Sequence, residues 1–151
     1  MVAPVRSLIL CALLPLAACS PTPGELKADA AESLAANRFA QARMELLAAL
    51  EEQPGDAQAL QMLAAAQVML GDGEGAAATL ARLGNATSEP LALLRAEAEL
   101  LRGRPSTALA AVQAFNSADA FRLRGLAHLA AGRPAEAWQQ LEAGLAAPGP
   151  K

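Results

Sequence analysis

An internal repeat is the strongest constraint on the fold of this chain. Four copies of one short pattern, a turn-forming residue followed five positions later by an alanine, begin at Asn37, Gly71, Gly103 and Gly132. The interval between successive copies shortens slightly towards the C-terminus. Apolar residues at spacings of three and four, the period of an amphipathic helix, flank the copies on both sides. The repeat therefore predicts stacked helix hairpins, each with its turn at one copy.

Composition supports a helical fold. Hydrophobic residues make up 54% of the 151 positions, but the chain has only three Phe and one Trp, and no Tyr. Alanine and leucine, which dominate this apolar content, favour helices, whereas aromatic and β-branched residues favour strands. Pro105 and Pro134 suit the first turn of a helix, where the missing N–H of proline leaves no hydrogen bond unmade. The sequence predicts one all-α domain.

The repeat resembles the tetratricopeptide repeat family, whose unit is a helix hairpin with a period of about 34 residues. The resemblance covers most of residues 24–148 and implies a right-handed superhelix of about four antiparallel hairpins. The matching residues are Phe39, Ala42, Leu46, Ala49 and Pro54 in the first unit, Leu60, Leu63, Ala64, Gly71, Ala76 and Leu80 in the second, Ala96, Gly103, Ala108 and Val112 in the third, and Gly125, Gly132, Ala137, Leu141 and Pro148 in the fourth. The chain departs from the family where a large first-helix residue is replaced by Ser33, Gln67, Glu99 and His128.

The first 18 residues have the layout of a secretion signal. Arg6 precedes an uncharged apolar run from Leu8 to Ala18, which is too short to span a bilayer. The run leads into Leu16-Ala17-Ala18-Cys19, which resembles the lipobox of bacterial lipoproteins. This resemblance implies that residues 1–18 are removed and that Cys19 is acylated. The alternatives are an ordinary signal followed by a free cysteine, or the buried N-terminal helix of a cytosolic protein.

These patterns divide the chain into four parts. We expect a signal peptide over 1–18, a lipidated cysteine and short tether over 19–23, a repeat domain over 24–148 and a tail over 149–151. By resemblance to enterobacterial lipoproteins, Ser20 after the cysteine favours the outer membrane, facing the periplasm. Removal of Arg6 leaves 11 basic and 15 acidic side chains, a net charge of −4, which argues against nucleic acid as a partner.

No set of residues in the repeat domain predicts catalysis, a cofactor or a metal site. His128 is the only histidine, whereas a zinc site needs three or four ligands. Glu97 and Glu99 lie two residues apart and cannot share a helix face as an acid–base pair. The glycine-rich residues 71–75 are interpreted as an inter-helix turn because no strand precedes them. Trp138 shares helical spacing with Leu141 and Leu145, which predicts a core stripe.

The expected function is therefore binding. By resemblance, the first helix of each hairpin lines a concave surface, and the candidate partner-binding residues on it are Lys27, Gln58, Gln61, Met69, Glu97, Arg122 and Leu126. A mixed polar and apolar lining suits a peptide. The alternative is a solvated face with no partner.

The leading functional hypothesis is a lipid-anchored periplasmic adaptor in envelope assembly, secretion or polysaccharide export, with a protein or peptide of the envelope as its partner. A second hypothesis is a pilotin-like lipoprotein that assists pilus or secretin assembly. A third, of another class, is an accessory subunit of a cell-wall enzyme. A polar face of Glu136, Gln139, Gln140 and Glu142 on the last helix predicts a monomer apart from its partner.

Overall fold

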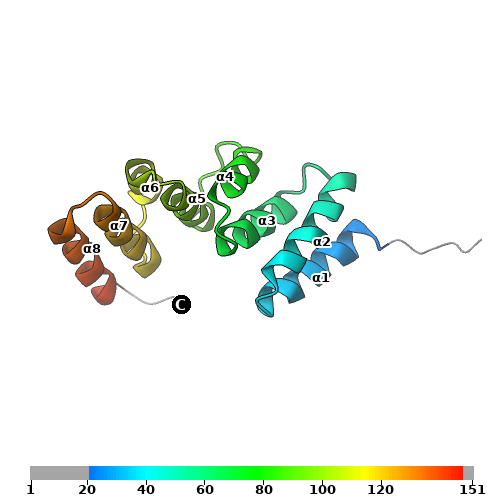
Figure 1. The fold of residues 1–151 in the computed structure, drawn as a ribbon, viewed down its shortest axis with the longest axis horizontal. Coiled ribbons are helices and arrows are strands. Elements are labelled where there is room, and N and C mark those ends of the chain that lie inside the picture. Colours follow the sequence, from blue (N-terminus) through cyan, green and yellow to red (C-terminus); the bar gives the residue numbers. More distant parts are fainter. Residues whose placement is uncertain (1–20, 148–151) are drawn as a thin grey trace, which may run out of the picture.

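The computed structural model describes residues 21–147, and these form eight α-helices without a strand (Figure 1). The helices pack consecutively as hairpins, so the expected all-α repeat solenoid is confirmed. Their bounds are α1 Pro23–Ala35, α2 Phe39–Glu52, α3 Ala57–Met69, α4 Gly73–Ala81, α5 Glu89–Leu101, α6 Pro105–Val112, α7 Ala118–Ala130 and α8 Pro134–Ala146. The predicted signal peptide and Cys19 lie outside the described residues, as does Pro148.

Each hairpin turn falls at one copy of the sequence pattern. Asn37, Gly71, Gly103 and Gly132 all have a positive φ, between 57° and 77°. In the second hairpin the backbone N–H of Asp72 donates to the carbonyl of Gln67, and that of Gly71 donates to the carbonyl of Val68. This pair of bonds is the Schellman motif, which satisfies free carbonyls at a helix end and needs a left-handed residue, usually glycine. The turn residues therefore end the odd-numbered helices and reverse the chain.

The first helix begins earlier than the sequence indicates. Pro23, which the sequence placed in the tether, is the first residue of α1. The Thr22 hydroxyl accepts from the N–H of Glu25, and the Glu25 carboxylate accepts from the N–H of Thr22, forming a capping box. Proline fits the first helical position, so Thr22-Pro23 begins the helix rather than delaying it.

The odd-numbered helices form the inner layer of a curved stack (Figure 1). α1 contacts α3, α3 contacts α5, and α5 contacts α7, whereas no two even-numbered helices of the described chain touch. In a curved stack, helices on the concave side lie closer together than helices on the convex side. The odd-numbered helices are therefore on the concave side and the even-numbered helices on the convex side. The expected first helices of the hairpins are thus the ones that line the inner surface.

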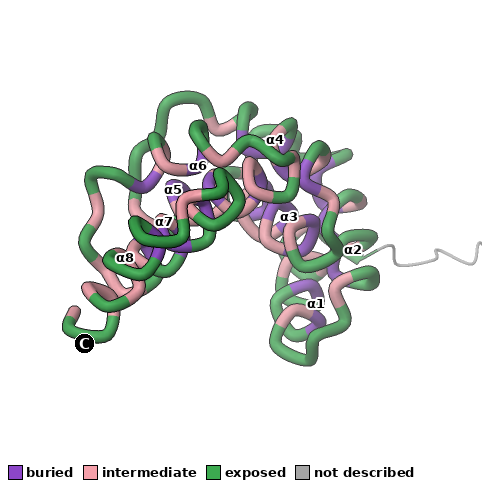
Figure 2. Tube along the Cα trace, turned by 60° about the vertical axis from the view of Figure 1, so that its left-hand side comes forward, coloured by how far each residue is buried: buried purple, intermediate pink, exposed green. Residues whose placement is uncertain are grey.

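The core is a row of small clusters between the layers (Figure 2). The first cluster contains four leucines and two alanines: Ala30, Leu46, Leu50, Ala59, Leu60 and Leu63. The cluster around α7 contains mainly alanine: Ala96, Ala108, Val112, Ala120, Leu123 and Ala127. Close approach requires glycine at Gly73, where an added Cβ would lie 2.6 Å from Cβ of Leu101, and at Gly125, where it would lie 2.7 Å from the side chain of Leu141. Small residues therefore set the helix separation there.

Candidate inner groove

The helix α5 separates two hollows of the solenoid because its residues point in two directions. Residues two apart in a helix point about 200° from each other, as expected for Glu97 and Glu99. Glu97 lines a hollow of about 400 Å³ on the inner side, whereas Glu99 lines one of about 480 Å³ between α4 and α6. We call the first hollow the inner groove; it is lined by Val68, Glu97, Leu100, Leu101, Arg122, Leu123, Leu126 and Ala130.

The inner groove is bordered by large apolar side chains that remain partly exposed. Leu101 and Leu126, which line the groove, are 48% and 41% exposed, and Met69, next to the lining residue Val68 at the end of α3, is 60% exposed. These residues come from three successive odd-numbered helices, so one surface extends across α3, α5 and α7. A concentration of exposed apolar side chains in one hollow is typical of a binding surface, because solvent contact with them is unfavourable.

One cation lies at the rim of the groove and is held by two carboxylates. Arg122 Nη2 is 2.9 Å from Glu97 Oε1, and Arg122 Nε is 3.4 Å from Asp119 Oδ1. Partial burial opposes the charge of Arg122, but the hydrogen bonds to both carboxylates outweigh it and raise its pKa. These three groups carry one net negative charge, so a carboxylate from a partner would have to compete with two that are already bound.

The structure brings together three of the seven predicted partner-binding residues. Glu97, Arg122 and Leu126 line the inner groove, and Met69 adjoins the lining residue Val68. The other three lie outside the groove: Lys27 Nζ is 2.6 Å from Asp56 Oδ2, the carboxylate that caps α3, and Gln58 and Gln61 lie in the first two turns of α3. In the amino-terminal part of the predicted surface, Lys27 thus forms an ion pair within the chain.

Several groove residues were not among the sequence candidates. Leu101 and Ala130 occupy, in the next two repeats, the position that Met69 has in the second. Val68 and Leu100 are related by the same interval as Met69 and Leu101. Because Met69 was predicted to lie on the inner surface, adding the repeat intervals to its number would have identified Leu101 and Ala130 as groove residues.

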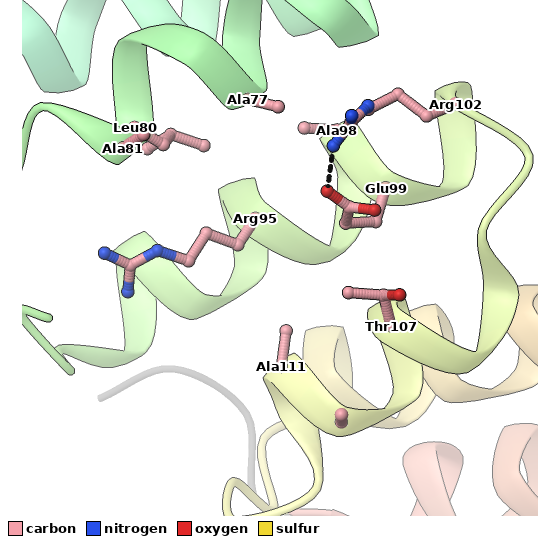
Figure 3. Close-up of a pocket in the computed structure, with 10 residues that line it drawn as sticks. Ala77, Leu80, Ala81, Arg95, Ala98, Glu99, Arg102, Thr107 and Ala111 are labelled. Carbon is pink, nitrogen blue, oxygen red and sulfur yellow. Dashed lines mark hydrogen bonds and ion pairs between the residues drawn. The ribbon is translucent and has the colours of Figure 1, made fainter. Parts of the chain in front are cut away.

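The second hollow, which we call the outer slot, is lined by residues of α4, α5 and α6, with α5 between the other two helices (Figure 3). Five alanines, Ala77, Ala81, Ala98, Ala110 and Ala111, contribute to its lining. The Glu99 carboxylate accepts a hydrogen bond from Arg102, whose Nε is also 3.0 Å from Glu74 Oε1. Arg95 donates to the carbonyls of Gly84 and Ala86. The charged groups of the slot therefore bind mainly other groups of the same chain.

The remaining sequence candidates have structural positions. His128 is half-buried, and no group of three metal-binding side chains occurs in residues 21–147. Gly71 and Asp72 form the turn, and Asp72 Oδ1 accepts from the N–H of Gly75 at 2.8 Å, as an N-cap of α4. The core position predicted for Trp138 is wrong, because the side chain is 69% exposed. Helical spacing alone does not show whether another helix covers the stripe.

Comparison with known proteins finds no matching family model and no matching curated protein sequence. Among residues 21–147, no helix is both long and apolar enough to cross a membrane. The geometry of the groove is therefore the basis on which its function is inferred.

Proposed function

We propose that this protein is a lipid-anchored adaptor of the bacterial cell envelope that holds a protein or peptide partner in the inner groove and has no catalytic role. The observation that carries the proposal is the groove itself, in which exposed apolar side chains from three helices converge beside an ion pair. A tetratricopeptide-like solenoid is suited to this role because its repeats build an extended curved surface.

The groove has the composition of a protein-binding surface. Complete burial of one leucine or methionine side chain contributes about 1.5–3 kcal/mol, so covering three half-exposed ones gives a partner substantial binding energy. The ion pair at the rim contributes little to affinity but limits which partners fit, because charged groups that are poorly matched on binding are destabilising. Affinity would thus come from Met69, Leu101 and Leu126, and selectivity from the Arg122 network.

The proposed anchor is the acylated Cys19, as its lipobox-like sequence implies, with the outer membrane as the site and the periplasm as the compartment. Each buried methylene of an acyl chain adds about 0.8 kcal/mol, so several chains would hold the protein at the membrane almost permanently. We expect Cys19→Ser to abolish incorporation of labelled palmitate and to release the protein into the soluble fraction. Membrane retention of the unlabelled variant would contradict the anchor.

The groove is tested by site-specific crosslinking in the native host. A photo-crosslinking amino acid at Leu126 should capture one envelope protein, which mass spectrometry would identify. The matched control is Leu47, which is 45% exposed but lies on α2 outside the groove. A partner captured at position 126 and not at 47 supports the adaptor function, and secretin or pilus subunits among the products would favour the pilotin-like role.

A double variant tests the energetics of the groove. Leu101→Ser with Leu126→Ser should reduce partner capture at least tenfold while circular dichroism remains that of the folded chain, because both side chains are already about half exposed. Leu47→Ser is again the control. Undiminished capture by the folded double variant would place the binding surface elsewhere.

A further inference from the structure

The outward side of α8 is an apolar surface that nothing in residues 21–147 covers. Leu145 is 91% exposed and Trp138 is 69% exposed, and the one buried residue of α8 is Ala137. A groove of about 300 Å³ beside Leu141 and Leu145 reaches Ala118 and Arg122 of α7. We call Trp138, Leu141, Glu142 and Leu145 the terminal face.

The equivalent surfaces of the other even-numbered helices are covered by the next odd-numbered helix. Leu46 and Leu50, which correspond to Leu141 and Leu145, pack against α3 residues in the first cluster. In the second hairpin the equivalent residue is Leu80, which packs in one cluster with Leu91 of α5. In the third it is Val112, which packs with Ala120 and Leu123 of α7. Three copies of this interface within one chain show what geometry the terminal face accepts: an antiparallel helix with small or apolar contact residues.

We infer that the terminal face docks an amphipathic α-helix of another protein, in the position that α3, α5 and α7 take against the preceding hairpin. This surface is separate from the inner groove except for Arg122, and the inference does not depend on the proposed function.

The charge of the terminal face indicates a basic residue at one position of this helix. Glu142 occupies the position of Ala81, the last residue of α4, which lines the outer slot together with Arg95 of the next helix, α5. A helix docked on α8 in the same way would place the residue that corresponds to Arg95 beside Glu142. Within the described residues Glu142 forms no ion pair, and Arg122, which lines the groove beside Leu145, is already bound to Glu97 and Asp119. Arginine or lysine at the position of Arg95 would complement the exposed carboxylate.

A second copy of this chain is a poorer occupant. Among the helices of residues 21–147, α1 is the one that no described hairpin precedes, and its exposed Glu25 and Asp29 stand where α3 has the buried Ala59 and Leu63. Docking of α1 would bring these carboxylates towards Glu142, and a twofold pairing of two terminal faces would bring the two Glu142 side chains together. Like charges at an interface are destabilising, so the occupant is a different polypeptide.

The chain contains its own reporter for this interaction, since Trp138 is its only tryptophan. The probe is a synthetic peptide with the sequence of residues 89–102, which contains α5 and no tryptophan. A hydrocarbon staple between positions 93 and 97 holds the peptide helical. In the protein these two positions do not belong to the cluster through which α5 packs against α4, so the staple leaves the docking side free. We expect it to shift the Trp138 emission to shorter wavelength in a saturable manner, because the indole leaves water.

Two matched changes test the charge and the surface. A peptide with Arg95→Glu should bind roughly three- to tenfold more weakly, and the protein variant Glu142→Lys should remove or reverse this preference. The protein variant Leu145→Gln should weaken both peptides, whereas Leu47→Gln should weaken neither.

Three outcomes would overturn the inference. The first is no emission shift with the arginine peptide at any concentration that keeps it soluble. The second is a shift that appears on raising the protein concentration alone, which would assign the face to a second copy. The third is a shift produced by phosphatidylglycerol vesicles but not by the peptide, which would assign it to a membrane surface. Mutation of Leu101 and Leu126 to serine should leave the peptide response unchanged, so failure of the inner-groove proposal is measured separately.

Discussion

Where one hairpin packs against the next, the solenoid has a junction. The first junction, between α2 and α3, and the third, between α6 and α7, are equivalent helix contacts but bury different side chains. Between α2 and α3 the buried cluster is mainly leucine, whereas between α6 and α7 it is mainly alanine with Val112 and Leu123. The interval between turns is also longer from Asn37 to Gly71 than from Gly103 to Gly132. A leucine junction gains more free energy from apolar area removed from water, while an alanine junction relies on helices that approach closely. The two ends should therefore tolerate opposite kinds of substitution.

Removal of a large side chain from the first junction should have the strongest effect. Leu46 is fully buried, so Leu46→Ala removes apolar contacts and leaves a cavity, and should cost about 2–5 kcal/mol of the free energy of unfolding. Val112, also fully buried, is the equivalent residue in the third junction, and Val112→Ala removes fewer carbon atoms. Denaturant unfolding of both variants measures the difference. Equal losses would contradict the proposed contrast between the junctions.

Enlargement of a small buried residue should also destabilise the fold. Ala108 is fully buried in the third junction, so Ala108→Trp forces α5, α6 and α7 apart and should cost at least about 1–3 kcal/mol. Ala76→Trp, at the equivalent position of the second hairpin, should cost a similar amount. The control is Ala40→Trp, at an exposed position of α2, which should change stability by less than about 0.5 kcal/mol. If thermal or denaturant unfolding does not separate buried from exposed alanines, the hairpin contacts are wrongly assigned.

A pH dependence confined to the first junction should be the weakest effect. The hydrogen bond from Lys27, followed by that from the N–H of Ala59, holds the pKa of Asp56 below its ordinary value. A carboxylate with a lowered pKa in the folded state stabilises the fold fully above its ordinary pKa of about 4, and this contribution disappears as the pH falls through the lower value. Asp56→Asn keeps the helix cap but loses the charge, so it should cost about 1 kcal/mol or less at neutral pH and flatten the acid limb of stability.

The measurement is the free energy of unfolding of the wild type and of Asp56→Asn from neutral to acidic pH. The difference between them should shrink towards zero below the ordinary aspartate pKa. A constant difference across this range would show that the Lys27 contact does not link α1 to α3 through the charge of Asp56.

The hairpin turns are the most predictable part of the fold. A glycine or asparagine at a helix end is favoured where the chain needs a positive φ, and that requirement is local, so Asn37, Gly71, Gly103 and Gly132 can be assigned without any tertiary information. The start of α1 is different, because the two nearby prolines suggest a tether while the Thr22–Glu25 capping box begins a helix. Local hydrogen bonding and not proline content decides where that helix begins.

The candidate site is predictable only in outline. The repeat intervals place Met69, Glu97, Arg122 and Leu126 on odd-numbered helices, and that much follows from the period alone. Whether such residues share a hollow depends on the distance between neighbouring helices. In the structure Lys27 pairs with Asp56 outside the groove, whereas Glu97 pairs with Arg122 at its rim. Trp138 and Leu145 show the same limit, since an apolar stripe is equally periodic whether it is covered or exposed.

Backbone preferences and apolar spacing are enough to specify the helices, their turns and the order in which the hairpins stack, because each of these depends on residues within one hairpin or its neighbour. The burial of individual apolar side chains, the two carboxylates that hold Arg122 and the open side of α8 could not be obtained in this way. Those features depend on how closely each helix approaches the helices packed against it, and that distance is fixed by the tertiary packing of the side chains between them.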